Sequence, residues 1–339
     1  MSAPPTGLIA FAIHEKGKDP FPEQVFADPL VSGVDLLMQW DNVEPAPNTF
    51  DWSVLDCVFA QADAHHKFVA LALVPGFRSP PWVLQTPGVQ TQSFKFSYDD
   101  NAPARPLPLP WNEVYLNTWF TFVSAVAQRY GNTPEFRLIE VGGPTSVSTE
   151  MSLPDRETGD TALPDSAHGS DIAEWISLGY TPARYVNAWK ESFDKFHELF
   201  PHQYLGLALY PGLPIGSNGV EDRRERVATL NSVIAVGMRY KQQFDLQEDG
   251  IKGRPTQPSD PEYNAVRDHC GDIVTGLQNA KSETVSPADQ GPLSQALEHV
   301  VAAGVDFWEV YVRDVDNPSM NDVLRRASTQ LPAHEQCKH

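Results

Sequence analysis

The chain has 339 residues, and its 44 acidic and 25 basic side chains give a formal net charge of −19. Hydrophobic residues make up 41% and charged residues 20% of the chain, a composition that supports a large core and excludes a disordered or collagen-like protein. Because so acidic a surface repels phosphate groups, we expect no nucleic-acid partner and no binding to an anionic membrane.

The sequence contains no apolar run of about 20 residues, so we expect no membrane-spanning segment. It also contains no signal-peptide pattern at its start. We therefore expect a soluble protein, either cytoplasmic or exported with its signal peptide missing from this chain. The oligomeric state stays open. The three cysteines, Cys57, Cys270 and Cys337, lack metal-type spacing and allow one disulfide or none, which leaves at least one free thiol in a monomer.

Short apolar runs alternate with longer amphipathic stretches along the chain. The apolar runs predict eight buried strands, at residues 8–13, 34–40, 68–74, 136–141, 204–210, 244–247, 273–278 and 307–312. Apolar residues three and four apart predict helices over 51–66, 112–130, 182–200, 221–240 and 292–303. Asp51 and the pair Thr181–Pro182 are start signals, and Gly131 is a stop signal.

Strands without strict polar alternation are buried on both faces, as parallel strands are. Eight such strands, mostly followed by helices, predict a single-domain α/β protein, a (β/α)₈ TIM barrel over residues 1–339. Long loops follow the third and fourth strands, and the proline-rich residues 101–111 should form a stiff extended loop at the functional face. A doubly wound open sheet is the competing architecture.

Carboxylates and aromatic residues are abundant where the strands end. The sequence has no dinucleotide-binding, P-loop or nucleophile-elbow motif, and His65-His66 precedes the third strand, at the face that serves stability. We therefore expect neither a metal nor an organic cofactor. The second strand runs into Trp40-Asp41-Asn42-Val43-Glu44-Pro45 and then Phe50-Asp51-Trp52, and the third into Pro75-Gly76-Phe77-Arg78-Ser79-Pro80-Pro81-Trp82.

These motifs resemble the glycoside hydrolases of clan A, the retaining (β/α)₈ enzymes, and most closely the family 42-like β-galactosidases. The likeness is strongest over residues 33–82, moderate to about residue 200 and thinner beyond. It implies two catalytic carboxylates, an acid/base at the end of the fourth strand and a nucleophile at the end of the seventh. One must hold a proton for the leaving oxygen while the other stays ionised.

The resemblance makes Glu150 the acid/base, with Glu140 and an ordinary surface glutamate as alternatives. Gly142-Gly143-Pro144 stands where the family usually has Asn-Glu. Glu283 is the corresponding nucleophile, although it is nearly as compatible with a solvated loop position beside Lys281. If Glu283 is not the nucleophile, Glu309 is the leading substitute, unless it is a core residue paired with Arg313 or Arg78.

Sugar rings stack on aromatic side chains, and their hydroxyls need polar partners. We expect substrate binding by residues at the strand ends, namely Trp40, Asp41, Arg78, Trp82, His14, Tyr210, Gln278 and Glu309. Arg78 would hold a carboxylate in its ionised state. His14 is equally compatible with a structural role, and Trp40 with a position outside the cleft.

The sequence thus predicts a retaining glycoside hydrolase that cleaves a β-linked oligo- or polysaccharide. A barrel that binds carbohydrate without hydrolysing it is the alternative, and the missing Asn-Glu pair favours it. A lyase or aldolase would need a lysine or a metal cluster at a strand end, and Lys281 is the sole lysine so placed.

Overall fold

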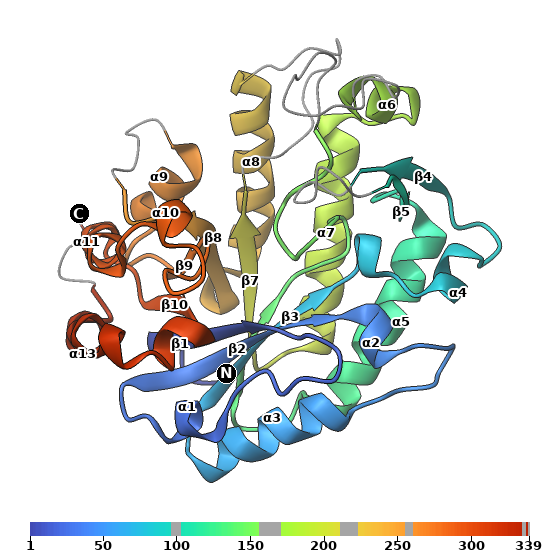
Figure 1. Cartoon of the computed structure of the whole chain (residues 1–339). Coiled ribbons are helices and arrows are strands. Elements are labelled where there is room, and N and C mark those ends of the chain that lie inside the picture. The colour runs from blue at the N-terminus through green and yellow to red at the C-terminus, as the bar shows by residue number, and fades with distance from the viewer. Residues whose placement is uncertain (96–102, 156–170, 211–222, 255–259, 334–336, 338–339) are drawn as a thin grey trace.

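Eight parallel strands close into a barrel in the computed structural model, which describes residues 1–95, 103–155, 171–210, 223–254, 260–333 and 337 (Figure 1). Around the ring the order is β1-β2-β3-β6-β7-β8-β9-β10, and β10 pairs with β1. The strands are β1 (Gly7–Ile13), β2 (Val31–Gln39), β3 (Phe68–Val74), β6 (Phe136–Glu140), β7 (Tyr204–Leu209), β8 (Phe244–Ile251), β9 (Val274–Asn279) and β10 (Phe307–Tyr311). This confirms the expected TIM barrel and excludes the open sheet.

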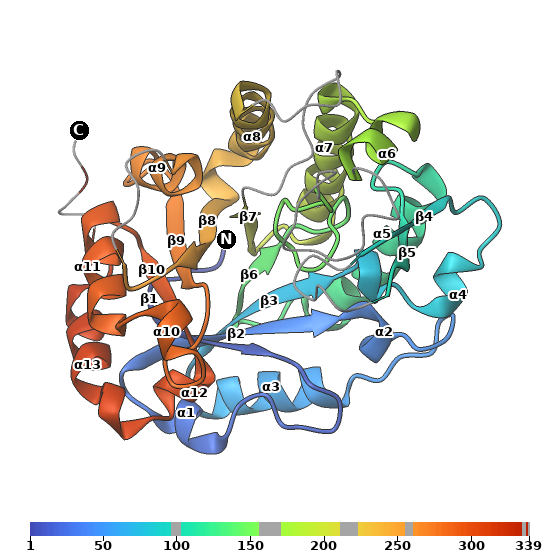
Figure 2. The ribbon, with the colours of Figure 1, turned by 45° about the horizontal axis from the view of Figure 1, so that its top comes forward.

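Helices surround the strands (Figures 1 and 2). The longer ones are α3 (Ser53–Ala64), α5 (Glu113–Tyr130), α7 (Pro182–Leu199), α8 (Arg223–Gly237), α9 (Pro261–Asp268), α11 (Leu293–Ala303) and α13 (Asn321–Gln330). Shorter turns of helix are α1 (Glu23–Ala27), α2 (Trp40–Val43), α4 (Pro81–Leu84), α6 (Asp171–Ser177), α10 (Pro287–Gln290) and α12 (Val312–Val315), with 3₁₀ turns η1 (Gly76–Arg78), η2 (Met238–Gln243) and η3 (Pro318–Met320). Within the described residues, no helix is both long and apolar enough to cross a membrane.

The start signal Thr181–Pro182 acts as expected, whereas the N-cap residue of α3 is Trp52, one position after Asp51. The Thr181 hydroxyl accepts a hydrogen bond from the Arg184 backbone N–H at 3.1 Å, and Pro182 opens α7. Asp51 accepts the Ser53 backbone N–H at 3.0 Å, directly before α3. These local hydrogen bonds satisfy amides that a helix leaves without a partner at its first turn.

Two predicted segments differ from the structure. Residues Arg105–Pro108 form strand β5, which pairs antiparallel with β4 (Thr91–Phe94), where the sequence predicted only an extended loop. Prolines are tolerated there because an edge strand need not donate every N–H. The helix expected over 221–240 ends at Gly237 and continues as η2, with non-helical backbone angles at Tyr240.

The barrel interior changes from apolar to polar along the strands. A small cluster of Ile9, Phe68, Ala70, Leu138, Val274 and Phe307 fills one layer. Side chains two residues further along a strand point to the same face. Glu140 therefore lies one step beyond Leu138, and Glu309 one step beyond Phe307, both toward the C-terminal ends of the strands. The apolar layer is thus the floor beneath a layer of acidic side chains.

A disulfide joins Cys270, directly before β9, to Cys337 near the end of the chain, 67 residues away, while Cys57 is free and exposed. This agrees with the expected single bridge at most. The bridge lies against the turn after α11, where the Cys270 sulfur contacts the Gly304 carbonyl oxygen at 3.3 Å.

We expect Cys337→Ser to lower the free energy of unfolding by about 2–4 kcal/mol, because the open chain gains loop entropy when it unfolds. Urea unfolding without reductant measures this. Cys57→Ser is the matched control and should leave the stability unchanged. Equal stability of the two variants would contradict the prediction.

Candidate active site

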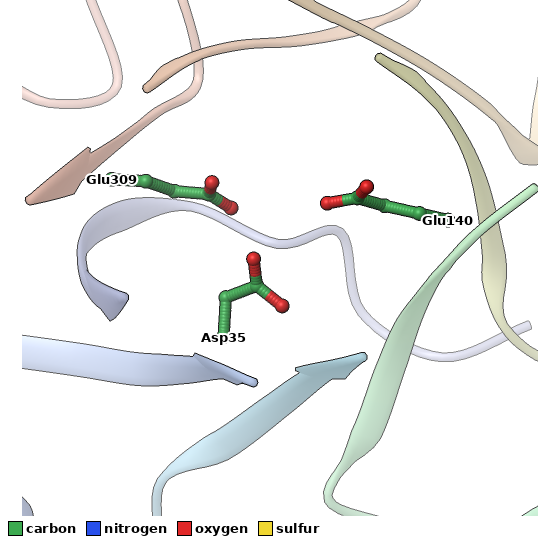
Figure 3. Close-up of side chains that lie close together, drawn as sticks. All are labelled: Asp35, Glu140 and Glu309. Carbon is green, nitrogen blue, oxygen red and sulfur yellow. The ribbon is translucent and has the colours of Figure 1, made fainter. Parts of the chain in front are cut away.

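Three carboxyl groups meet inside the barrel. Asp35 of β2, Glu140 of β6 and Glu309 of β10 point toward one another, and one oxygen of each lies within 4.8 Å of the others (Figure 3). We call these three residues the inner carboxyl cluster. All are buried, with at most 2% of the side chain exposed. Glu140 therefore points into the barrel and not outward toward a helix.

Burial is the main cause of the unusual electrostatics of the inner carboxyl cluster. It raises the pKa of Asp35 and Glu309 well above the ordinary range, and it raises the pKa of Glu140 to about 7. Charges of neighbouring carboxylates add to each shift. The largest contributions to these three shifts are burial, neighbouring carboxylates and hydrogen bonds.

Strand β8 lines the same space with alternate residues. Gln247 donates from Nε2 to Glu140 Oε1 at 3.1 Å and to Asp249 Oδ1 at 3.0 Å, so one amide bridges two carboxyl groups. Asp245 is fully buried, and burial raises its pKa, with further contributions from the charges of Asp306 and Glu140. Asp249 is partly exposed at the strand end, so it connects the buried cluster to the outside.

Glu150 is delivered to this region by residues 141–154, which follow β6 and are all buried. The Ser148 hydroxyl donates to Glu150 Oε2 at 2.6 Å, and the Thr149 hydroxyl donates to Glu140 Oε2. The next residue, Met151, is fixed to β7 by a backbone hydrogen bond to Ala208 at 3.1 Å. The charge of Glu150 raises the pKa of both Glu140 and Asp249, so these three carboxyl groups are electrostatic neighbours.

Gly76, in the predicted motif after β3, supports this segment by a close backbone approach. The Phe77 N–H donates to the Ser146 carbonyl at 2.9 Å. Gly76 has a φ of +61°, and a Cβ there would lie 2.3 Å from the Ser146 oxygen. Both the backbone angle and the missing side chain are therefore required.

We expect Gly76→Ala to destabilise the protein by about 1–3 kcal/mol and to displace the segment that carries Glu150. Gly17→Ala is the matched control, because Gly17 has a φ of +80° but nothing within 4 Å of the added Cβ. Chemical denaturation of both variants separates the steric clash from the backbone strain. If Gly76→Ala lowers the free energy of unfolding no more than Gly17→Ala does, the close approach of Gly76 to the Ser146 carbonyl does not contribute to stability.

A pocket of about 280 Å³ opens beside β1 and β10. Phe11 and Tyr311 line it and pack edge to face at 5.1 Å, and Glu15, Lys18 and Arg313 supply charged groups. Burial raises the pKa of Tyr311, followed by the charges of Glu150 and Asp249. Tyr311 therefore lies between the pocket and the carboxyl groups.

Glu283, the expected nucleophile, has its carboxylate engaged elsewhere. Its Oε2 accepts the backbone N–H of Leu293, the first residue of α11, at 2.6 Å. The Glu283 N–H donates to Asp314 Oδ2 at 3.0 Å, and Asp314 also accepts from Ser282 and Thr284. These bonds give Glu283 a helix-capping position at the start of α11.

We expect Glu283→Ala to reduce stability by about 1 kcal/mol, the usual effect of removing a helix cap. Glu283→Gln should lose less, since its amide oxygen can still accept the Leu293 N–H. Thermal and urea unfolding of both variants test this. Equal losses for both variants would argue against capping.

The aromatic residues that were expected to bind substrate lie mostly outside the ring of strands. Trp40 is completely buried, packs on Trp119 and Phe122 of α5, and donates to Glu44 Oε2 at 2.9 Å. Trp82 is half-buried and donates to the Glu44 carbonyl oxygen at 3.2 Å. In this arrangement Trp40 supports the core beneath α2, which differs from the expected place in a cleft. Tyr210, directly after β7, is half-buried.

The predicted polar residues divide into two groups. Gln278 of β9 lies beside Glu309 of β10 in the strand register, within the barrel. His14 is buried and hydrogen-bonds to Asn42 at 3.3 Å, and burial lowers its pKa. Asp41 lies near Arg78, whose charge partly opposes the rise that burial causes in the Asp41 pKa. This second group surrounds α2.

Sequence reasoning did not select Asp35, Asp245 or Asp249, and it weighed Glu140 only as an alternative to Glu150. Asp245 gave no clear signal, because β8 carries several polar residues. Asp35 and Glu309 each interrupt a mostly apolar strand, and an acidic residue is rarely buried without a function or a partner. That interruption was the available signal. It could not say which acids meet, because this depends on the strand register around the closed ring.

Residues 31–150 match the model of glycoside hydrolase family 42, described as beta-galactosidase. The chain resembles glycoside hydrolases. The matched stretch runs from β2 to Glu150 and includes Asp35 and Glu140, so the likeness inferred from the sequence is confirmed where the candidate site is built. No curated protein matches the chain.

Solved structures share the barrel. Xylanase 10B of Thermotoga petrophila, in complex with xylobiose, has a TM-score of 0.51 and 11% identity over 90% of this chain and 82% of the xylanase. Xylanase 10B of Thermotoga maritima gives 0.52 and 11% over the same shares. A β-galactosidase of the haloarchaeon Halorubrum lacusprofundi gives 0.50 and 13%, over 90% of this chain but only 52% of that protein. At these identities the likeness establishes the fold alone.

Proposed function

We propose that this chain is a glycoside hydrolase that cleaves β-linked saccharides at the mouth of its barrel. The observation that carries the proposal is the electrostatic proximity of Glu140, Glu150 and Asp249. The charges of Glu150 and Asp249 also act on Tyr311, which lines an aromatic pocket. Hydrolysis of a glycosidic bond needs one protonated and one ionised carboxyl near each other. Two carboxyl groups at short range cannot both ionise easily, so such a pair tends to hold one proton.

We assign the proton to Asp249 and the negative charge to Glu150. Burial raises the pKa of Asp249 well above its usual range, and Asp249 is partly exposed, so it can reach a leaving oxygen. The Ser148 hydroxyl donates to Glu150, and a hydrogen bond to a carboxylate favours the ionised form. In this assignment Asp249 takes the acid role that the sequence predicted for Glu150. Glu150 takes the nucleophile role predicted for Glu283, whose carboxylate caps α11.

The pocket beside Tyr311 supports a sugar as the ligand. Its volume of about 280 Å³ is near the lower end of the range of small-molecule sites, and it suits a sugar ring better than a large cofactor. Phe11 and Tyr311 offer apolar faces, and Glu15, Lys18 and Arg313 offer groups for hydroxyls. The matched family model and the xylanases that share the fold make β-galactosides and β-xylosides the first substrates to test.

We expect Glu150→Gln and Asp249→Asn each to lower kcat/KM by about 10²–10⁴ on β-glycosides with poor leaving groups. A dinitrophenyl leaving group needs no proton, so Asp249→Asn should recover most activity on dinitrophenyl glycosides while Glu150→Gln should not. Steady-state kinetics on both substrate types measure this. The matched control is Glu283→Gln, which makes the same chemical change at a capping position and should stay active.

Full activity of either Glu150→Gln or Asp249→Asn would remove that residue from its role. An inactive, folded Glu283→Gln would return the nucleophile to Glu283, and recovery by Glu150→Gln in place of Asp249→Asn would reverse the two roles. The expected retaining course is tested separately by NMR of the first-formed anomer.

A second function is favoured by the burial of residues 141–154 over the inner carboxyl cluster. A barrel closed in this way could bind carbohydrate without hydrolysing it. Saccharide-induced thermal stabilisation of the wild-type protein with no turnover would support this alternative over the enzyme.

A further inference from the structure

Several carboxyl oxygens of the inner carboxyl cluster have no hydrogen-bond donor among the described residues. Both oxygens of Glu309 are buried and have no hydrogen-bond partner among the described residues. Asp35 lies near the Leu36 backbone N–H, but neither of its oxygens makes a well-formed hydrogen bond to any residue that the structure describes. Only Glu140 is fully engaged, by Thr149 and Gln247. Such groups are costly to bury unless a proton or a cation neutralises them.

Two further side chains at the edge of the cluster are also unsatisfied. Asp245 is fully buried, and neither of its oxygens has a hydrogen-bond partner in the described part of the chain. A Cβ placed on Gly206 would lie 3.3 Å from both Asp245 Oδ2 and Glu140 Cγ, so Asp245 borders the cluster. The buried Oε1 of Gln247 is likewise without a partner, while its Nε2 contacts Glu140. The atoms without a hydrogen-bond partner in and beside the inner carboxyl cluster are therefore all oxygens.

We propose that Asp35, Glu140 and Glu309 bind a hard divalent cation, such as Ca²⁺ or Mn²⁺, inside the barrel. Oxygens bound to one Ca²⁺ at 2.3–2.6 Å lie at most about 5 Å apart, which agrees with the 4.8 Å limit observed here. Carboxylate and amide oxygens are the donors that Ca²⁺, Mg²⁺ and Mn²⁺ prefer, and the three residues offer no nitrogen or sulfur donor. The unpartnered oxygens of Glu309, aimed into the cluster in Figure 3, point to the same occupant.

This site lies on three strands that are far apart in sequence, so a bound cation would link β2, β6 and β10 across the barrel. The expected role of the cation is to hold the Glu140 carboxyl group in place. The hydroxyl of Thr149, the residue before Glu150, donates to this carboxyl group, so its position affects that of Glu150. The inference does not depend on the proposed hydrolysis, because cation binding and turnover are measured independently. It replaces the expectation, drawn from the sequence, that no metal is involved.

The test uses the full chain, unfolded with a chelator and refolded with Ca²⁺, Mg²⁺, Mn²⁺ or no divalent cation, so that the buried site is filled during folding. We expect one equivalent of bound metal by elemental analysis and a melting temperature that rises with the cation concentration. Glu309→Gln and Asp35→Asn should each weaken binding by at least about tenfold. Glu262→Gln is the matched control, a buried carboxyl of α9 outside the cluster, and should bind as the wild type does.

Refolded wild-type protein that holds no metal, with the same melting temperature in all four conditions, would overturn the proposal and leave protons as the neutralising species. Metal bound equally by wild type, Glu309→Gln and Asp35→Asn would place the cation elsewhere. If one variant fails to fold, the other variant and the wild-type metal content still decide. Loss of hydrolysis without loss of binding would affect only the proposed function.

Discussion

The burial of several carboxyl groups within one closed ring of strands is the constraint on which the rest of this structure depends. Asp35, Glu140, Asp245 and Glu309 come from four strands, and each is at most 2% exposed. An ionised carboxylate in such a place is unfavourable by several kcal/mol unless it is paired. The floor below them is apolar and cannot help. Protons, hydrogen-bond donors or a cation must therefore come from the open end of the barrel.

The segment after β6 supplies one of these hydrogen-bond donors. Thr149 donates to Glu140, while Gln247 approaches the same carboxyl group from β8. The same segment positions Glu150, and its path depends on the close approach of Gly76 to Ser146. The element that satisfies a buried acid is thus also the element that brings a second acid to the mouth. This coupling makes the local stability of residues 141–154 a condition for any chemistry at Glu150.

Two groups with raised pKa values lie on the pocket side of the barrel. Asp249 and Tyr311 lie at strand ends, where the ring opens, and both have raised pKa values because of burial and nearby carboxylates. A raised pKa favours the protonated form, and a protonated group can donate to a leaving oxygen or to a hydroxyl of a bound sugar. A site made of such groups suits a neutral, hydroxyl-rich ligand better than an anionic one, in keeping with the net charge of −19.

The sequence by itself determined the eight strands, five of the longer helices and the barrel, because apolar periodicity and capping residues act locally. It did not predict α9 or α13. It also made Glu150 and the residues after the third strand candidates for the site, since both follow predicted strand ends. Tertiary structure alone decided which acids meet. The register around the ring sets Asp35 and Glu309 against Glu140, and the hydrogen bond to Leu293 turns Glu283 into a helix cap. Side-chain partners across a closed sheet depend on strands far apart in the chain, and no local pattern encodes that pairing.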